Sequence, residues 1–300
     1  MLDLQVNGYA GVDFNTDTLT PENLHTACLA LREDGVTGFL PTVITASLDA
    51  MQRRLENLVE FRASDPLAQQ LISGFHIEGP FINETRGYVG AHPIEHVTPA
   101  TPDNAQRLVD AAAGLAKIVT LAPERDPDMA TTRHLADQGI VVAAGHCNPD
   151  LDQLHASIDA GLKLFTHLGN GCPAEIHRHD NIINRVLSFS DQLHISLIPD
   201  GTHIPFFALK NLLAVIPPER AIFVSDAISA ARLGPGIYTL GHWTLDIGDD
   251  LVARSPDGSH FVGSTITLPR MKSETQPALN LSDADLSRLT LTNPTNLLNS

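Results

Sequence analysis

Short apolar runs alternate with longer amphipathic segments over most of the chain. Each apolar run is bounded by glycine, proline or polar residues, as β-strands are, and each longer segment has the length and periodicity of a helix. Strands that alternate with helices are typical of an α/β protein with a parallel sheet. The runs that we predict as strands are residues 2–6, 38–45, 74–78, 118–122, 141–146, 162–167, 194–198 and 221–224.

Eight strand-like runs separated mostly by helical segments predict a (β/α)₈ TIM barrel. Capping residues mark helix starts at both ends of the chain: Thr20 precedes a helix that begins with Pro21, and Ser282 precedes the last helix. Glycine, proline and turn signals in residues 234–263 predict a short β-hairpin excursion. We find no linker or repeat, so we expect residues 1–300 to form one domain.

Several predicted strands end in a residue that can bind a metal or transfer a proton. Glu78, His146, His167 and Asp226 stand at or just after such ends. The carboxyl ends of the strands meet at one mouth of a barrel. Three protein ligands, here one carboxylate and two imidazoles, leave the fourth position of a catalytic metal open for a water. We predict that Glu78, His146 and His167 bind a metal and that Asp226 acts as general base and then acid. Taken singly, each histidine could be a buried residue satisfied by the backbone, and Asp226 could cap a helix or hydrogen-bond to a metal ligand instead of transferring a proton.

The composition narrows the choice of partners. A net charge of −16, from 19 Lys plus Arg against 35 Asp plus Glu, argues against nucleic acid. The three cysteines are odd in number and form no CxxC pair, so the sequence indicates neither a disulfide framework nor a thiolate zinc site, which fits a reducing cytoplasm. The N-terminus has no signal-peptide pattern and no apolar run approaches membrane-spanning length, so we expect neither export nor a membrane anchor.

Seven short motifs follow one another in the order seen in one enzyme family. They are QVNG at residues 5–8, HIEGPF at 76–81, GAH at 90–92, GH at 145–146, THLGN at 166–170, DGTH at 200–203 and SDA at 225–227. Together they closely resemble the N-acetylglucosamine-6-phosphate deacetylases of the amidohydrolase superfamily, over nearly the whole chain. The resemblance implies a metal-dependent hydrolase that converts N-acetylglucosamine 6-phosphate to glucosamine 6-phosphate and acetate.

The resemblance also implies the metal content. Glu78, His146 and His167 match the metal ligands of the family, and we expect one divalent ion, with zinc as the first choice. Gln5 and Asn7 stand where other amidohydrolases carry a second pair of metal-binding histidines, which is why a single ion is implied.

Further matches assign roles around the substrate, a phosphorylated amino sugar. Asp226 matches the catalytic acid/base, and His92 matches a residue that helps to polarise the acetyl carbonyl. His203 matches a sugar-contacting histidine. The turn at Asn170 and Gly171 matches the turn that contacts the phosphate. Arg178 matches an arginine that reaches the phosphate in the neighbouring active site of a homodimer.

Two departures from the family pattern leave alternatives open. The chain begins at Leu2 after the initiator Met1 and stops at Ser300, so we expect the barrel to lack most or all of the accessory β-sandwich. The turn after His167 reads Leu-Gly-Asn-Gly-Cys, where the family commonly has a bulky residue before Asn and Ala-Met after it. The substrate could therefore be the N-acetylgalactosamine epimer. Other interpretations are an amidohydrolase acting on a small amide or cyclic imide, and a catalytically silent sugar-phosphate-binding barrel.

Overall fold

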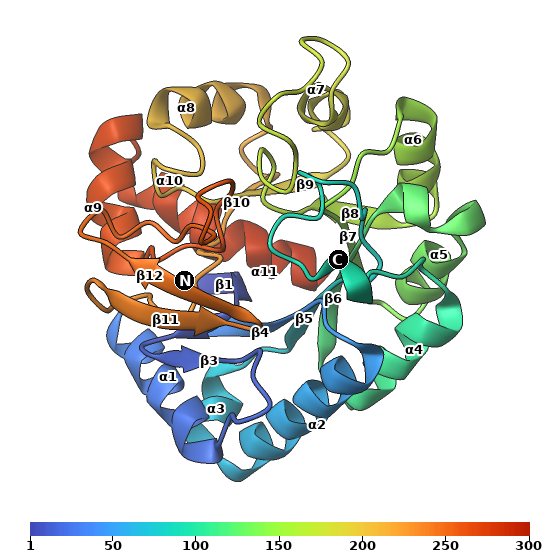
Figure 1. Cartoon of the computed structure of the whole chain (residues 1–300). Helices are drawn as coiled ribbons and strands as arrows, with labels where there is room; N and C mark the ends of the chain where they lie inside the picture. The colour runs from blue at the N-terminus through green and yellow to red at the C-terminus, as the bar shows by residue number, and fades with distance from the viewer.

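The computed structural model describes residues 1–300, and its centre is one sheet of eight parallel strands with helices around it (Figure 1). The order of strands in the sheet follows their order in the chain, as in a (β/α)₈ barrel, so the predicted fold class is confirmed. The strands are β1 (Leu2–Val6), β4 (Gly38–Ile44), β5 (Phe75–Glu78), β6 (Ala116–Leu121), β7 (Val141–Ala144), β8 (Leu162–Phe165), β9 (His194–Leu197) and β10 (Ala221–Phe223).

Most predicted helices are confirmed, and two short helices were not predicted. The helices are α1 (Pro21–Glu33), α2 (Leu48–Ser64), α3 (Pro66–Leu71), α4 (Pro102–Ala111), α5 (Ala130–Ala136), α6 (Leu151–Asp159), α7 (Ile182–Leu187), α8 (Phe206–Val215), α9 (Leu268–Leu279), α10 (Asp283–Ser287) and α11 (Asn293–Leu298). The unpredicted ones are α3 and α7, each of six residues. None of the helices is both long and apolar enough to cross a membrane.

The predicted cap residues begin their helices. The Thr20 side chain accepts from the backbone N–H of Asn23 at the start of α1, and Ser282 accepts from Asp285 at the start of α10. Each of these bonds satisfies an N–H that has no partner inside the helix.

A cluster of buried apolar side chains joins the strands of the barrel. This cluster takes residues from nearly every strand, and Leu297 of α11 joins it: Leu2, Leu4, Leu40, Ile118, Val141, Ala143, Leu164, Ile198, Ile222 and Val224. Strand β5 places His76 inside instead, where Nδ1 donates to the carbonyl of Leu4 (3.0 Å) and Nε2 lies 2.7 Å from the Thr120 hydroxyl. Burial lowers the pKa of His76 to about 4, so the ring is neutral.

The barrel is closed between β1 and β10 by few contacts. No hydrogen-bonded ladder joins these two strands; instead Val6 forms a parallel bridge with Ala227, just beyond β10. Oδ1 of Asp3 also accepts from the backbone N–H of Ser225 at 3.1 Å. We call this junction the seam.

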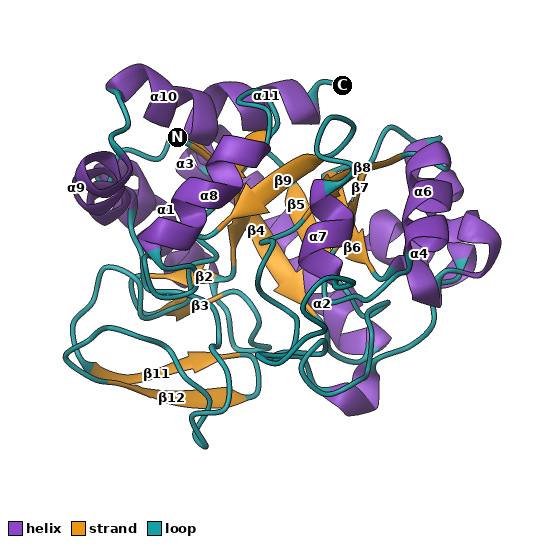
Figure 2. Cartoon of the chain, turned by 90° about the horizontal axis from the view of Figure 1, so that it is seen from above, coloured by secondary structure: helices purple, strands orange, loops and turns teal.

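Two small hairpins lie at the end of the barrel where the carboxyl ends of the strands meet. They pair β2 (Gly8–Tyr9) with β3 (Val12–Asp13), and β11 (Gly236–Leu240) with β12 (Trp243–Ile247). In Figure 2 the β11–β12 hairpin lies opposite α10, α11 and both chain termini. The hairpin has its own apolar cluster, which includes Leu240, Leu245 and Ile247 and reaches the barrel through Ile44 of β4. The β2–β3 pair was not predicted, because Gly8 and Gly11 interrupt the apolar pattern there.

Candidate metal centre and active site

The strands deliver the predicted site residues to one mouth, but they end earlier than predicted. Strands β7 and β8 stop at Ala144 and Phe165, whereas the apolar pattern continued to His146 and His167. The reason is the backbone: His146, His167 and Asp226 have φ values of 50°, 32° and 50°. Non-glycine residues seldom adopt this left-handed conformation, and such residues cluster at functional sites.

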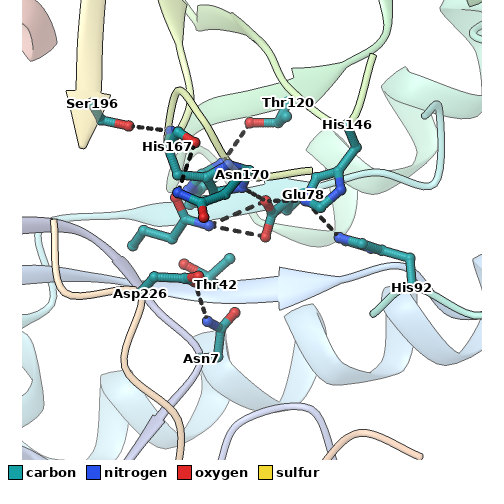
Figure 3. A network of polar contacts seen from close by, with 12 residues as sticks. Asn7, Thr42, Glu78, His92, Thr120, His146, His167, Asn170, Ser196 and Asp226 are labelled. Carbon is teal, nitrogen blue, oxygen red and sulfur yellow. Dashed lines mark hydrogen bonds and ion pairs between the residues drawn. The ribbon is translucent and has the colours of Figure 1, made fainter. Parts of the chain in front are cut away.

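The carboxylate of Glu78, the last residue of β5, is the centre of the cluster (Figure 3). Its Oε1 lies 2.9 Å from Nε2 of His167 and 3.3 Å from Nε2 of His146. Burial by itself would raise the pKa of Glu78, but the two histidines outweigh burial and hold the pKa well below its usual range. Glu78 is therefore a buried anion with two imidazoles against it.

His92 reaches the same cluster from the loop after β5. Its Nε2 lies 3.2 Å from Nε2 of His146, and its Nδ1 lies 2.8 Å from the Thr45 hydroxyl. Burial lowers the pKa of His92 to about 3, so this ring is neutral. Glu78, His92 and His146 present ligand atoms that all lie within 4.8 Å of one another.

The chemistry of these donors fits a divalent cation. Nδ1 of His146 lies 2.9 Å from the carbonyl of Tyr88, which can only accept, so a neutral His146 directs the lone pair of Nε2 at Glu78 and His92. Nδ1 of His167 is buried and has no partner. One carboxylate and imidazole nitrogens are the donors that zinc prefers. The predicted ligands are Glu78, His146 and His167. The set whose ligand atoms all lie within 4.8 Å of one another has His92 in place of His167.

Two glycines flank the His146 ring. A Cβ on Gly171 would lie 2.8 Å from Nδ1 of His146, and a Cβ on Gly90 would lie 3.0 Å from its Cε1. Both glycines have φ near +60°, at +60° and +57°. The close approach and the left-handed backbone together explain glycine at both positions.

Asp226 lies across the mouth from these rings. Nδ2 of Asn7 donates to its Oδ1 at 2.7 Å. Burial raises the pKa of Asp226 to about 6, and the charge of Glu78 adds to the effect. The carboxylate is therefore mostly ionised at neutral pH but close enough to its pKa to take up and release a proton.

These side chains line one cavity of about 370 Å³. Of the residues predicted to contact substrate, Asn170, Gly171 and His203 line it, but Arg178 does not. Arg178 is exposed on the segment between β8 and α7. The lining contains no lysine or arginine.

The cavity residues that come from the segment after β12 were not predicted. Ser259, His260 and Phe261 line the cavity, and the Phe261 ring lies 4.7 Å from the ring of His203. The residues lie within the predicted excursion, where the turn signals predict a hairpin but not the surface that it faces. Nε2 of His260 is buried without a partner.

Comparison with known proteins yields consistent relatives, although no protein-family model matches the chain. The chain is 30% identical over 296 residues to the N-acetylglucosamine-6-phosphate deacetylase of Bacillus subtilis, covering 98% of this chain and 73% of that protein. It is 33% identical over 277 residues to the Bos taurus enzyme of the same name, covering 89% and 64%. It is also 30% identical over 268 residues to the N-acetylgalactosamine-6-phosphate deacetylase of Escherichia coli O157:H7, covering 89% and 68%. The chain thus spans 64–73% of the length of these three relatives.

Solved structures agree with the sequence relatives. An aspartate-to-alanine mutant of the Mycobacterium smegmatis N-acetyl-D-glucosamine-6-phosphate deacetylase, in complex with N-acetyl-D-glucosamine-6-phosphate, superposes with a TM-score of 0.88 at 28% identity, covering 99% of this chain and 76% of that one. The Thermotoga maritima deacetylase superposes with a TM-score of 0.86 at 27% identity, covering 99% and 77%. With the same fold and this level of identity along almost its full length, this chain belongs to the N-acetylglucosamine-6-phosphate deacetylase family.

Proposed function

We propose that the protein hydrolyses the acetamide of N-acetylglucosamine 6-phosphate, releasing acetate and glucosamine 6-phosphate. The observation that carries the proposal is the pairing, in one cavity, of a Glu78–histidine cluster with the ionisable carboxylate of Asp226. An amide needs both an activated nucleophile and a proton for its leaving nitrogen, and this pairing provides groups for both. The names of the relatives supply the substrate class.

One divalent cation, with zinc as the first choice, would be held by Glu78, His146 and His167, with His92 within reach of the same position. When bound, such a cation polarises a carbonyl oxygen and acidifies a water. We expect about one equivalent in purified protein, because Gln5 and Asn7 offer amides rather than two imidazoles for a second ion.

Asp226 moves the proton in this proposal. Its carboxylate takes a proton from the attacking water and then gives it to the amine nitrogen as the carbon–nitrogen bond breaks. A pKa of about 6 suits both steps at neutral pH. In this proposal His92 is not a ligand of the cation: its neutral ring, at the edge of the cluster, donates a hydrogen bond from Nε2 to the carbonyl oxygen as negative charge develops on it.

The phosphate needs positive charge from outside the cavity lining. Glu78 and Asp226 are acidic, and no lysine or arginine lines the cavity. We propose that Arg178 of a second copy supplies this charge in a homodimer, since a guanidinium binds phosphate bidentately.

The remaining contacts bear on the sugar. We propose that the backbone at Asn170 and Gly171 binds the phosphate and that His203 contacts the sugar, because all three line the cavity. The N-acetylgalactosamine epimer is the second candidate substrate, since one relative at 30% identity is named for it. A reducing cytoplasm is the proposed location, in keeping with three free cysteines.

Acetate release is the direct test. The purified protein is incubated with each sugar 6-phosphate and with unphosphorylated N-acetylglucosamine, before and after chelation and after metal is restored. We expect chelator-sensitive acetate release from a phosphorylated substrate and little from the unphosphorylated sugar. No release after metal-replete preparation would favour the catalytically silent barrel. Equal release with and without phosphate would favour another amidohydrolase activity.

A further inference from the structure

Gln5 makes two contacts with the central carboxylate of the site. Its side chain is buried, with 1% of the residue exposed. Nε2 lies 3.1 Å from Oε1 and 3.1 Å from Oε2 of Glu78, so the amide N–H groups of Gln5 are directed at the carboxylate. The amide oxygen Oε1 has no partner, which fixes the orientation of the amide: turned around, the oxygen would face an anion.

Asn7 makes the corresponding contact with the other acid. The residue is 2% exposed, and its Nδ2 donates to Oδ1 of Asp226 at 2.7 Å while its own Oδ1 has no partner. Its backbone N–H also donates to the carbonyl of Ala227 at 2.7 Å. Asn7 therefore holds the Asp226 segment by main chain and side chain.

The backbone of β1 brings both amides to the mouth. The pairing of β1 with β4 shifts between Asp3 and Val6: Asp3 pairs with Phe39 and Val6 with Pro41, so β1 has one residue more than β4 in this stretch. Such a bulge re-aims side chains and is common beside active sites. Residues 5 and 7 then point the same way, towards acids that come from different strands.

We propose that β1 positions the two acids of the site separately. Gln5 is a positioning residue for Glu78, and through it for the affinity of the cation site. Asn7 is a positioning residue for Asp226, and through it for proton transfer; this second part rests on the proposed function.

The choice of amides has a physical reason. A neutral donor orients a carboxylate without cancelling its charge, whereas a lysine or arginine at the same place would compete with the cation. Asn7 occupies one oxygen of Asp226, and the second oxygen stays free to exchange a proton with water or substrate. Partners behind metal ligands typically change metal affinity or activity 10–100-fold.

The test compares Gln5→Met, Asn7→Leu and a matched control, Asn293→Leu. The control also removes a buried amide, whose Nδ2 donates to the carbonyls of Pro218 (2.8 Å) and Ala221 (2.6 Å) at the start of β10. For each protein we measure the Zn²⁺ dissociation constant by competition with a chromophoric chelator, kcat and KM for acetate release, and Tm.

Gln5→Met should lose Zn²⁺ affinity, whereas Asn7→Leu should lose turnover. Gln5→Met should weaken Zn²⁺ binding about 10–100-fold, and its kcat should recover when Zn²⁺ is saturating. Asn7→Leu should keep its Zn²⁺ affinity and KM and lose kcat about 10–100-fold. Asn293→Leu should lower Tm alone. Gln5→Ala and Asn7→Ala replace any variant that does not fold.

The proposal is overturned if Gln5 and Asn7 variants behave like the control, or if both weaken Zn²⁺ binding equally. If the wild-type protein binds Zn²⁺ but releases no acetate, the proposed function fails, while the Zn²⁺ affinities still decide the role of Gln5.

Discussion

Replacing Gly90 by alanine tests whether the loop after β5 sets the position of His146. An alanine Cβ would lie 3.0 Å from Cε1 and 3.2 Å from Nδ1 of the imidazole, and the backbone φ is +57°. The left-handed conformation costs a non-glycine residue about 1–2 kcal/mol. The ring must also move by a few tenths of an ångström, although Nδ1 is held by the Tyr88 carbonyl on the same loop. We expect Gly90→Ala to be about 1–2 kcal/mol less stable, with Zn²⁺ bound roughly 10–100-fold more weakly.

Gly139→Ala is the matched control for Gly90→Ala. Gly139 also has a left-handed backbone, with φ of +75°, but no atom lies within 4 Å of an added Cβ. The control should show a similar loss of stability by calorimetry and an unchanged Zn²⁺ affinity by chelator competition. If Gly90→Ala binds Zn²⁺ as tightly as Gly139→Ala does, the contact with His146 does not position the ring and the reasoning is wrong.

Three further predictions concern proton transfer, the phosphate and pH. Asp226→Asn should keep its Zn²⁺ and lose kcat by about a hundred to ten thousand fold; near-normal turnover would remove Asp226 from the mechanism, and lost Zn²⁺ would make it a ligand. Arg178→Ala should raise KM for the sugar phosphate by an amount equivalent to about 1.5–3 kcal/mol and leave the unphosphorylated sugar unaffected, and equal effects on both would mark Arg178 as structural. Burial raises the pKa of Asp3 from 3.8 to about 6. The folded state therefore loses about 3 kcal/mol of stability as the pH rises from 3.8 through about 6, because the buried carboxyl binds its proton more tightly than it does in the unfolded chain. Urea unfolding of Asp3→Asn should show a pH dependence weaker by that amount, and an unchanged dependence would contradict the assignment.

The barrel could be predicted because its strands are buried on both faces. Strands such as β7 and β10 are uniformly buried and contain only apolar residues, so each appears in the sequence as a short continuous apolar run between helices. Helices α3 and α7 were missed because six residues are too few to show a helical periodicity. In addition, a single residue separates α3 from α2, so the two helices appear as one segment in the sequence. The ends of β7 and β8 were placed too late because hydrophobicity does not report the positive φ of the residues that follow.

The site could be predicted only in part. The sequence brought Glu78, His146, His167 and Asp226 together because each stands at or just after a strand end, and barrel topology brings strand ends together. The contact between His92 and His146 depends on how a long loop folds back, which no periodicity encodes. The place of His260 in the cavity depends on how the β11–β12 region packs against β4, and that packing is decided by side-chain shape.

The seam between β1 and β10 has a consequence for folding kinetics. The contact between Asp3 and Ser225 joins residues 222 positions apart, and closing so long a loop costs more conformational entropy than pairing neighbouring strands. We therefore expect β1 to dock late during folding and its amide hydrogens to exchange with solvent sooner than those of β6 or β7. Because Gln5 and Asn7 lie on or just after β1, each opening of the seam would release both acids at once, so the lifetime of the assembled site is set by the attachment of the first strand.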